Sequence, residues 1–325
     1  MTPALKRPLS VVALFPTGAG ALGSICHKGR RALNATNSTF LTRRGLRLAA
    51  DVEGEGRRGA VMLAHGGGQT RHSWASTTRR LAERGWKAVS LDLRGHGDSD
   101  WDPAGDYHID RYAEDLIDVA AALPGKPALI GASLGGIAGM MVEAVLAPGT
   151  FASLTLVDII PRTDPSGVEK IMGFMGAHLE HGFHSLEAAA ETIAAYLPHR
   201  PRPTDLSGLG KNLRQGADGR YRWHWDPKFV TGVRRGRSPA HGEDLEARCR
   251  DIDIPVHLIR GRMSELVSLE GAQAFVAGLK HGSFTDVADA GHMVAGDRND
   301  AFMQAVIDFL ESPGGSAAYS GTAGQ

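Results

Sequence analysis

Short, nearly continuous apolar runs alternate with helix-like patterns in the first half of the chain and again near its end. The runs that predict buried strands are Val61–Ala64, Lys87–Leu93, Ala128–Ile130, Leu154–Ile159, Val256–Ile259 and Phe284–Val287. Apolar residues at helical spacing predict helices over Ser76–Arg84, Ile109–Leu123, Leu134–Leu146 and Ala301–Leu310. Ahead of these, Thr39–Thr42 and Leu46–Val52 predict an opening hairpin. The alternation predicts an α/β fold, a mostly parallel, doubly wound sheet of about eight strands.

The alternation stops over residues 163–248. This segment has two amphipathic patterns, Val168–Leu179 and Leu186–Leu197, and no good strand. A helical insertion in an α/β sheet predicts a lid over the carboxyl edge of the sheet, where ligands bind. We therefore expect a core over residues 39–162 and 249–311 with a helical lid over residues 163–248.

Composition narrows the class of protein. The 36 Lys and Arg residues balance 36 Asp and Glu residues, so no overall field favours nucleic acid. No apolar run approaches the length of a membrane span. The two cysteines lie far apart, which argues against a disulfide framework or a cysteine metal site. We expect a small-molecule substrate, no cofactor, no metal and no membrane span, and the sequence leaves the oligomeric state open.

The two ends differ from the rest of the chain. Residues 1–38 belong to a basic stretch that has no acidic residue before Asp51, a composition typical of either a disordered leader or an organellar targeting segment. The tail, residues 312–325, is rich in Gly, Ser and Ala and is expected to be disordered. We expect a cytoplasmic protein, with organellar targeting as the alternative.

The strongest chemical signal is the glycine-rich turn Gly131–Gly136 around Ser133. It follows a predicted strand and opens a predicted helix, the context of a nucleophile elbow. Glycine is needed at 131 and 135 because side chains there would collide with the adjoining strand and helix. A serine hydroxyl needs an adjacent imidazole to accept its proton. His292, in the Gly291-His292 loop after the last strand, follows Ser133 in the chain order expected for that base.

A second glycine-rich turn, His65-Gly66-Gly67-Gly68, follows the first core strand. Such a turn directs backbone N–H groups into a site. We expect the N–H groups of Gly67 and Leu134 to form an oxyanion hole, with Gly68 as the alternative donor. A phosphate-binding loop is disfavoured because no G-x-x-x-x-G-K pattern occurs.

At this point the chain resembles the α/β-hydrolase family over about residues 45–311. The motifs that carry the resemblance are Leu63–Gly68, the D-x-R-G-x-G-x-S turn Asp92–Ser99, the elbow Gly131–Gly136, and Gly291-His292. The resemblance implies the fold but not the reaction, since the fold hosts many chemistries. Relatives that form alkyl-enzymes carry an aspartate at the elbow, so Ser133 favours acyl transfer. We interpret Arg94 and His96 as stabilising their own turn.

The acid of the triad departs from the commonest pattern of this family. The usual aspartate stands three residues after the glycine of the next-to-last strand, and here that position is Ser264, which carries no charge. Two candidates remain. Asp158 ends the strand after the elbow helix, a place that some members use, and Glu265 lies beside Ser264. We favour Asp158 and keep Glu265 as the alternative.

The lid contributes Tyr221, Trp223 and Trp225, which either line a substrate pocket or pack the lid against the core. The resulting hypothesis is a serine hydrolase that cleaves a small carboxylic ester, thioester or lactone through an acyl-enzyme. A cofactor-free haloperoxidase or perhydrolase would use the same triad. A receptor that binds without hydrolysis is disfavoured by the intact serine, histidine and oxyanion turn.

Overall fold

The computed structural model describes residues 35–198, 206–232, 243–292 and 299–312. The expected leader therefore lies almost wholly outside the described residues, and so does all but the first residue of the expected tail. The first strand begins at Thr36, three residues before the predicted start of the folded core. No helix among the described residues is long and apolar enough to cross a membrane.

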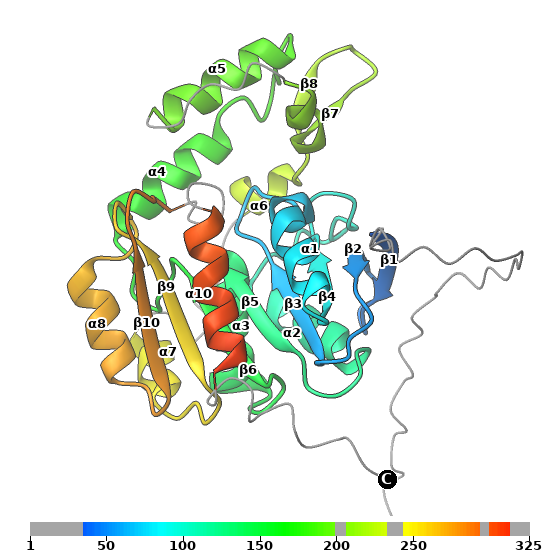
Figure 1. Ribbon diagram of the computed structural model, residues 1–325. Coiled ribbons are helices and arrows are strands. Elements are labelled where there is room, and N and C mark those ends of the chain that lie inside the picture. The colour runs from blue at the N-terminus through cyan, green and yellow to red at the C-terminus, as the bar shows by residue number, and fades with distance from the viewer. Residues whose placement is uncertain (1–34, 199–205, 233–242, 293–298, 313–325) are drawn as a thin grey trace, which may run out of the picture.

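Eight strands form one sheet in the order β1-β2-β4-β3-β5-β6-β9-β10 (Figure 1). Their bounds are β1 Thr36–Leu41, β2 Arg47–Glu53, β3 Ala60–Ala64, β4 Lys87–Leu91, β5 Ala128–Ala132, β6 Ser153–Val157, β9 Val256–Gly261 and β10 Gly282–Val287. The hairpin β1–β2 and the pair β2–β4 are antiparallel. All other pairs in the sheet are parallel. The predicted mostly parallel sheet of about eight strands is confirmed.

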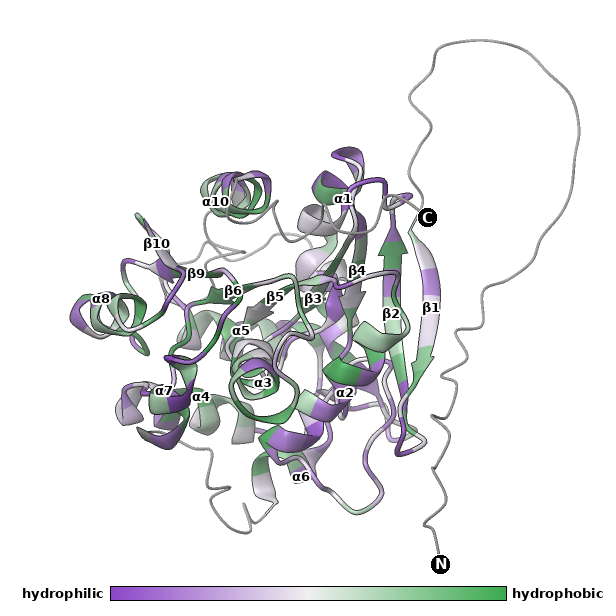
Figure 2. Cartoon of the chain, turned by 90° about the horizontal axis from the view of Figure 1, so that it is seen from below, coloured by the Kyte–Doolittle hydropathy of each residue, from purple (hydrophilic) through white to green (hydrophobic). Residues whose placement is uncertain are grey.

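Helices cover both faces of the sheet. Their bounds are α1 Ala75–Glu83, α2 Ile109–Ala121, α3 Leu134–Met141, α7 Glu243–Cys249, α8 Leu269–Ala277 and α10 Asn299–Glu311, with the short helical turns η1 Arg71–Trp74 and η2 Val142–Leu146. Figure 2 shows α1 and α10 on one side of the sheet and α2, α3 and α7 on the other. Alternate residues of β3 follow this division, because Val61 packs toward α1 and α10 and Met62 packs toward α2 and α3.

The elements from α4 to α6, which come between β6 and β9, stand above the ends of the central strands in Figure 1. They are α4 Pro165–Gly176, α5 Leu186–Tyr196, η3 Ser207–Asn212, β7 Leu213–Gln215, β8 Tyr221–Trp223 and α6 Pro227–Thr231, whereas α7, mostly within the predicted lid range, packs on the core. We call the elements from α4 to α6 the lid. They share a small apolar cluster of their own, which includes Met175, Phe183, Leu213, Trp223 and Trp225.

The expectation that this segment has no strand was wrong. β7 and β8 form an antiparallel hairpin that pairs Leu213 with Trp223. Each strand has three residues, too few to show an alternating pattern in the sequence. The readable signal was the turn Asp218-Gly219, where Gly219 has φ +76° and the Asp218 carboxylate accepts the N–H of Arg220.

Candidate active site

The turn between β5 and α3 holds Ser133 in a conformation that L-residues rarely adopt, with φ 43° and ψ −108°. Its glycines permit this close packing. A Cβ atom on Gly131 would lie 2.6 Å from the carbonyl oxygen of Gly135, and one on Gly135 would lie 2.5 Å from that of Ala64. The predicted collisions are therefore present, and they involve backbone atoms that have no room to move.

Asp158 lies directly across from this turn, on the neighbouring strand. Ala132 pairs with Val157 in the β5–β6 register, and the N–H of Ser133 donates to the carbonyl of Val157 at 3.2 Å. Asp158 is the next residue, it also has a positive φ of 50°, and it is fully buried. Parallel strands that end together thus bring the hydroxyl-bearing turn and the carboxylate to one point of the sheet edge.

The carboxylate of Asp158 meets the imidazole of His292. His292 Nδ1 lies 2.8 Å from Asp158 Oδ2. The N–H of Gly261 donates to Oδ1 at 3.0 Å, and the hydroxyl of Ser264 donates to Oδ2 at 2.6 Å. Among the described contacts, no hydrogen bond joins Ser133 Oγ to His292, and such bonds are often long before substrate binds.

Glu265 is placed differently from Asp158. Its side chain is 61% exposed, and both carboxylate oxygens lie 2.7 Å from Lys170 Nζ on α4. The structure therefore brings Asp158, and not Glu265, to the imidazole.

The sequence drew attention to the position of Ser264 but did not predict its hydrogen bond to Asp158. Ser264 stands where the usual acid of the family stands, and its hydroxyl holds the carboxylate that comes from the other strand.

The glycine turn after β3 lies beside the elbow. A Cβ atom on Gly66 would lie 3.2 Å from Ser133 Cβ, and the N–H of Gly66 donates to Gln69 Oε1 at 2.8 Å. Gly68 has φ +75°, which favours glycine. Leu134 is the first residue of α3, so its N–H has no carbonyl partner within the helix. The glycine turn and the first residue of α3 therefore both lie next to Ser133.

Three lid side chains lie against this glycine turn. Phe229 Cζ would be 3.3 Å from a Cβ on Gly67, and Met175 Cε and Trp225 Cζ3 would be 3.1 and 3.4 Å from one on Gly68. Met175 and Phe229 were missed, since an apolar residue in an amphipathic helix gives no sign of which surface it meets.

The three aromatic residues proposed for the lid take different places. Trp223 is buried, donates its indole N–H to the carbonyl of Ala177 at 3.0 Å, and stacks on Trp225 at 4.7 Å. Tyr221 is half-buried at the start of β8. Trp225 alone of the three lies near the glycine turn in the described contacts. Trp223 thus packs inside the lid, behind Trp225.

Buried polar residues support the turns below the site. Arg94 forms two hydrogen bonds of 2.6 Å with the Asp115 carboxylate. His65 Nε2 accepts the N–H of Leu93 at 3.0 Å, and burial lowers the pKa of His65 to about 4. Burial also lowers the pKa of His96 to about 3. Both histidines are therefore neutral near pH 7, and they pack the turns without exchanging protons.

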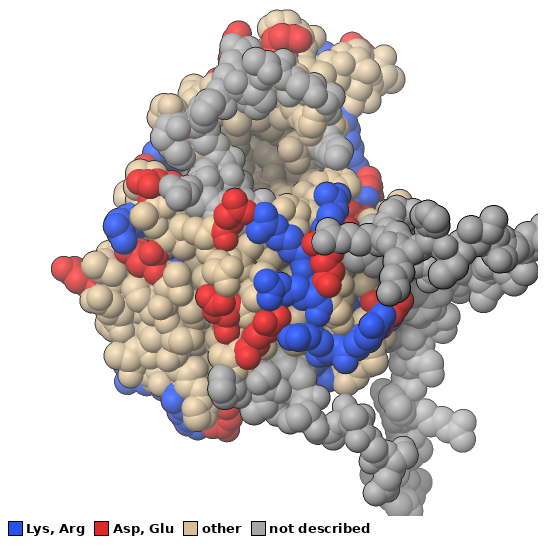
Figure 3. Space-filling view, viewed as in Figure 1, with Lys and Arg blue, Asp and Glu red and all other residues tan. Residues whose placement is uncertain are grey.

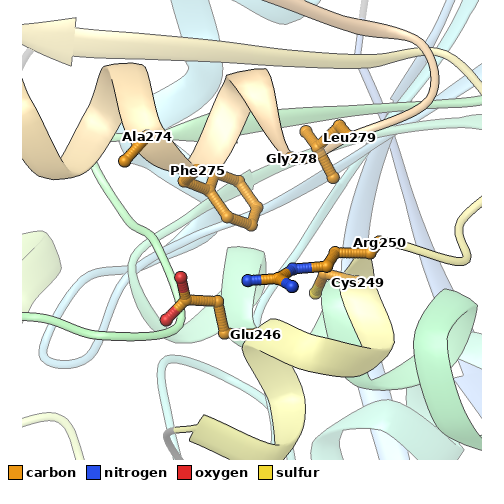
Figure 4. Close-up of a pocket in the computed structure, with 7 residues that line it drawn as sticks. All are labelled: Glu246, Cys249, Arg250, Ala274, Phe275, Gly278 and Leu279. Carbon is orange, nitrogen blue, oxygen red and sulfur yellow. The ribbon is translucent and has the colours of Figure 1, made fainter.

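Within the described residues, no three His, Cys, Asp or Glu side chains are grouped so as to hold a metal ion. Of the lid histidines, His181 is exposed, His178 packs on Phe183, and His199 lies outside the described residues. Figure 4 shows a small pocket between α7 and α8, where Glu246, Arg250 and Phe275 surround Cys249. It shares no residue with the site at Ser133.

The space-filling view shows the surface between the lid and the core. Figure 3 shows a deep hollow between the lid and the core, and its visible walls consist mainly of uncharged residues. Charged side chains gather lower on this face, over the core. The described walls are therefore suited to a substrate whose buried part is neutral.

Comparison with known proteins gives consistent matches. A family model described as alpha/beta hydrolase fold matches residues 59–298. The esterase Rv0045c of Mycobacterium tuberculosis is 29% identical over 258 residues, which cover 78% of this chain and 83% of that protein. A 3-hydroxybutyrate-oligomer hydrolase of Cupriavidus necator is 29% identical over 244 residues, which cover 71% of this chain and 82% of that protein.

Solved structures are similar over core and lid together. A crystal structure of E-2-(acetamidomethylene)succinate hydrolase matches with a TM-score of 0.75 at 22% identity, covering 86% of this chain and 100% of that chain. At this identity the likeness shows the fold alone. The structure of the M. tuberculosis esterase matches with a TM-score of 0.68 at 26% identity, covering 87% of this chain and 94% of that chain.

Proposed function

Since the chain belongs to the alpha/beta hydrolase fold family and is a hydrolase, we propose that it cleaves a small carboxylic ester, thioester or lactone through an acyl-enzyme on Ser133. The observation that carries the proposal is the contact of 2.8 Å between His292 Nδ1 and the buried Asp158, one strand away from the strained turn of Ser133. That arrangement is suited to making a serine hydroxyl nucleophilic.

The first half of the reaction forms the acyl-enzyme. Ser133 Oγ attacks the carbonyl carbon while its proton passes to His292 Nε2. Asp158 holds the Nδ1–H tautomer and stabilises the imidazolium. The negative oxygen accepts the N–H groups of Gly67 and Leu134, each worth on the order of 3–4 kcal/mol. The imidazolium then protonates the leaving oxygen or sulfur as its bond to the carbonyl carbon breaks.

The second half restores the enzyme. Water attacks the acyl carbon and gives its proton to His292, which returns it to Ser133 Oγ as the ester bond to the enzyme breaks. The products are the free acid and the alcohol or thiol. The reaction as written needs only the side chains and backbone of the protein, the substrate and water.

The substrate class rests on two supports. The relatives include a protein named as an esterase and one named as a 3-hydroxybutyrate-oligomer hydrolase, and such oligomers are esters. The hollow between the lid and the core has mainly uncharged described walls on the side that Figure 3 presents, which favours neutral acyl groups over highly charged ones.

The test compares wild-type protein with Ser133→Ala on a panel of p-nitrophenyl esters, thioesters and lactones. We expect turnover by the wild type, a loss of several orders of magnitude in Ser133→Ala, and fluorophosphonate labelling of Ser133. Peroxide-dependent bromination without ester turnover, or labelling of another serine, would overturn the proposal.

A further inference from the structure

The lid contains one histidine whose two ring nitrogens contact two different loops of the core. His224 follows β8 and is only 1% exposed. Its Nδ1 accepts the N–H of Gly97 at 2.8 Å, and its Nε2 lies 3.3 Å from the carbonyl oxygen of Gly68. Because an amide N–H only donates and a carbonyl only accepts, these contacts require the neutral ring with hydrogen on Nε2.

The surroundings keep His224 in that neutral form. Burial lowers its pKa well below the usual range, and the nearby rings of His96 and His65 and the guanidinium of Arg214 act in the same direction. His96 lies 5.9 Å from His224 between ring centroids. The tautomer is thus set by the packing and the two backbone partners, which leaves no proton for the ring to exchange near pH 7.

Other hydrogen bonds already hold this part of the lid to the core, at the turn of residues 94–97 and at Tyr107. The N–H of Asp226 donates to the carbonyl of Gly95 at 2.8 Å, and Tyr107 donates its hydroxyl to Asp226 Oδ2 at 2.6 Å. Arg214 of β7 donates to the carbonyl of Gly97. The bond from His224 to Gly97 adds to this set, but its bond to Gly68 reaches a different loop, the one beside Ser133.

That loop has a particular need for external support. Gly66, Gly67 and Gly68 are consecutive, and glycine has the greatest backbone freedom of any residue. One end of the loop is fixed by Gln69, whose Oε1 accepts the N–H of Gly66. The other end is fixed by His224 at the carbonyl of Gly68. Gly67, the expected oxyanion donor, lies between these two anchors.

We propose that His224 is a positioning residue that fixes the oxyanion loop from the lid, so that docking of the lid and formation of the oxyanion hole occur together. The inference rests on the proposed function, because it assigns Gly67 to the oxyanion. The oxyanion is stabilised only by donors held in place before the charge develops. A lid residue that holds the carbonyl of Gly68 therefore acts on the rate, and it does so through Gly67.

The two ring nitrogens allow the positioning role to be separated from simple anchoring of the lid. In His224→Asn, the amide oxygen can replace Nδ1 and keep the bond to Gly97, but nothing reaches Gly68. In His224→Gln, the longer side chain can replace the Nε2–H and keep the bond to Gly68. The control pair is His257→Asn and His257→Gln, since His257 is also buried and bonds Ser283 and Thr285 through its two nitrogens.

The measurements are kcat, KM, Tm and the affinity for a boronic acid that mimics the tetrahedral intermediate. We expect His224→Asn to lower kcat about 10- to 100-fold, by misplacing a donor, with KM nearly unchanged and boronate affinity reduced. His224→Gln should stay within about threefold of the wild type. The His257 variants should lower Tm without this loss of kcat.

The inference is overturned if His224→Asn keeps at least the activity of His224→Gln, or if kcat falls only in proportion to Tm across both histidine pairs. Should the His224 variants fail to fold, the unmodified protein still gives a test through 15N-histidine NMR. The Nε2–H signal of His224 should shift when the boronate binds, while the signal of His257 stays in place. An unmoved His224 signal would also overturn the inference. Failure of the proposed function is separate, because the wild type would then turn over no ester.

Discussion

The sheet edge that carries Ser133 and the lid above it are held by different kinds of contact. At the edge, backbone packs on backbone, and a Cβ atom on Gly135 would lie 2.5 Å from the carbonyl oxygen of Ala64. In the lid helix α4, a Cβ atom on Gly173 would meet nothing within 4 Å. The lid meets the core through side chains such as those of His224 and Asp226, and at a few points through backbone, as where the N–H of Asp226 donates to the carbonyl of Gly95. The turn that carries Ser133 is therefore packed closely on backbone, whereas part of lid helix α4 has open space around it.

The largest expected effect is at the carboxylate buried in the sheet edge. In Asp158→Asn the amide no longer carries the charge that stabilises the imidazolium and selects the Nδ1–H tautomer. We expect kcat on a p-nitrophenyl ester to fall about ten-thousandfold, with the fold intact by circular dichroism. Turnover within tenfold of the wild type would show that the contact between Asp158 and His292 has no part in catalysis.

The next prediction compares the sheet edge with the lid directly, by placing the same substitution, glycine to alanine, in each. Gly135→Ala places a methyl group against backbone atoms and should lower the free energy of unfolding by about 3 kcal/mol or more. Gly173→Ala, in open space on a lid helix, should leave that free energy unchanged or raise it by up to about 1 kcal/mol. Urea unfolding measures both. Equal effects of the two substitutions would remove the distinction between edge and lid.

Much of the edge could be predicted because it depends on local sequence. The apolar runs predicted the strands of the sheet, and small residues around Ser133 predicted a turn in which only glycine fits. Strand order and register then bring Asp158 beside that turn, and no side-chain detail is needed for this step. The sequence also predicted both candidate acids, although it could not decide where each side chain would point.

The parts that were missed depend on contacts between distant residues. The helices α7 and α8 are short, and no separate pattern in the sequence predicted them. Phe229 and Met175 meet the glycine turn only after the lid has folded over it. Ser264 was noted for its missing charge, while its hydroxyl bonds a carboxylate more than 100 residues away in the chain. Such contacts form only when the folded chain brings distant residues together, so a single sequence does not reveal them.

An intermediate effect is expected at Ser264. This residue stands where the family usually has its acid, and its hydroxyl supports Asp158, which follows a different strand, β6. Its hydroxyl donates to Asp158 Oδ2 at 2.6 Å and accepts the N–H groups of Leu266 and Val267. Without this bond the carboxylate of Asp158 is held less firmly against His292, and because misplacement of a catalytic group costs up to about 100-fold, Ser264→Ala should lower kcat about 10- to 100-fold. Ser264→Thr keeps a hydroxyl and should recover most of the loss.

The measurement is kcat on the same p-nitrophenyl ester for the wild type, Ser264→Ala and Ser264→Thr, with Tm as the control for folding. Equal losses of kcat in both variants, or a loss that only follows Tm, would assign Ser264 to packing alone.

The smallest effect is expected at Glu265, beside Ser264 but on the solvent side of the loop. Its side chain is mostly exposed and pairs with Lys170 of the lid, and exposed ion pairs contribute about 1 kcal/mol or less. Glu265→Gln should therefore keep kcat within about twofold of the wild type. Lys170→Met should have an equally small effect on kcat if the ion pair only joins the lid to the core. The matched comparison is Asp158→Asn on the same substrate. If Glu265→Gln abolished turnover while Asp158→Asn left it near normal, the loop after β9 would supply the acid and the carboxylate buried in the sheet edge would have only a structural role.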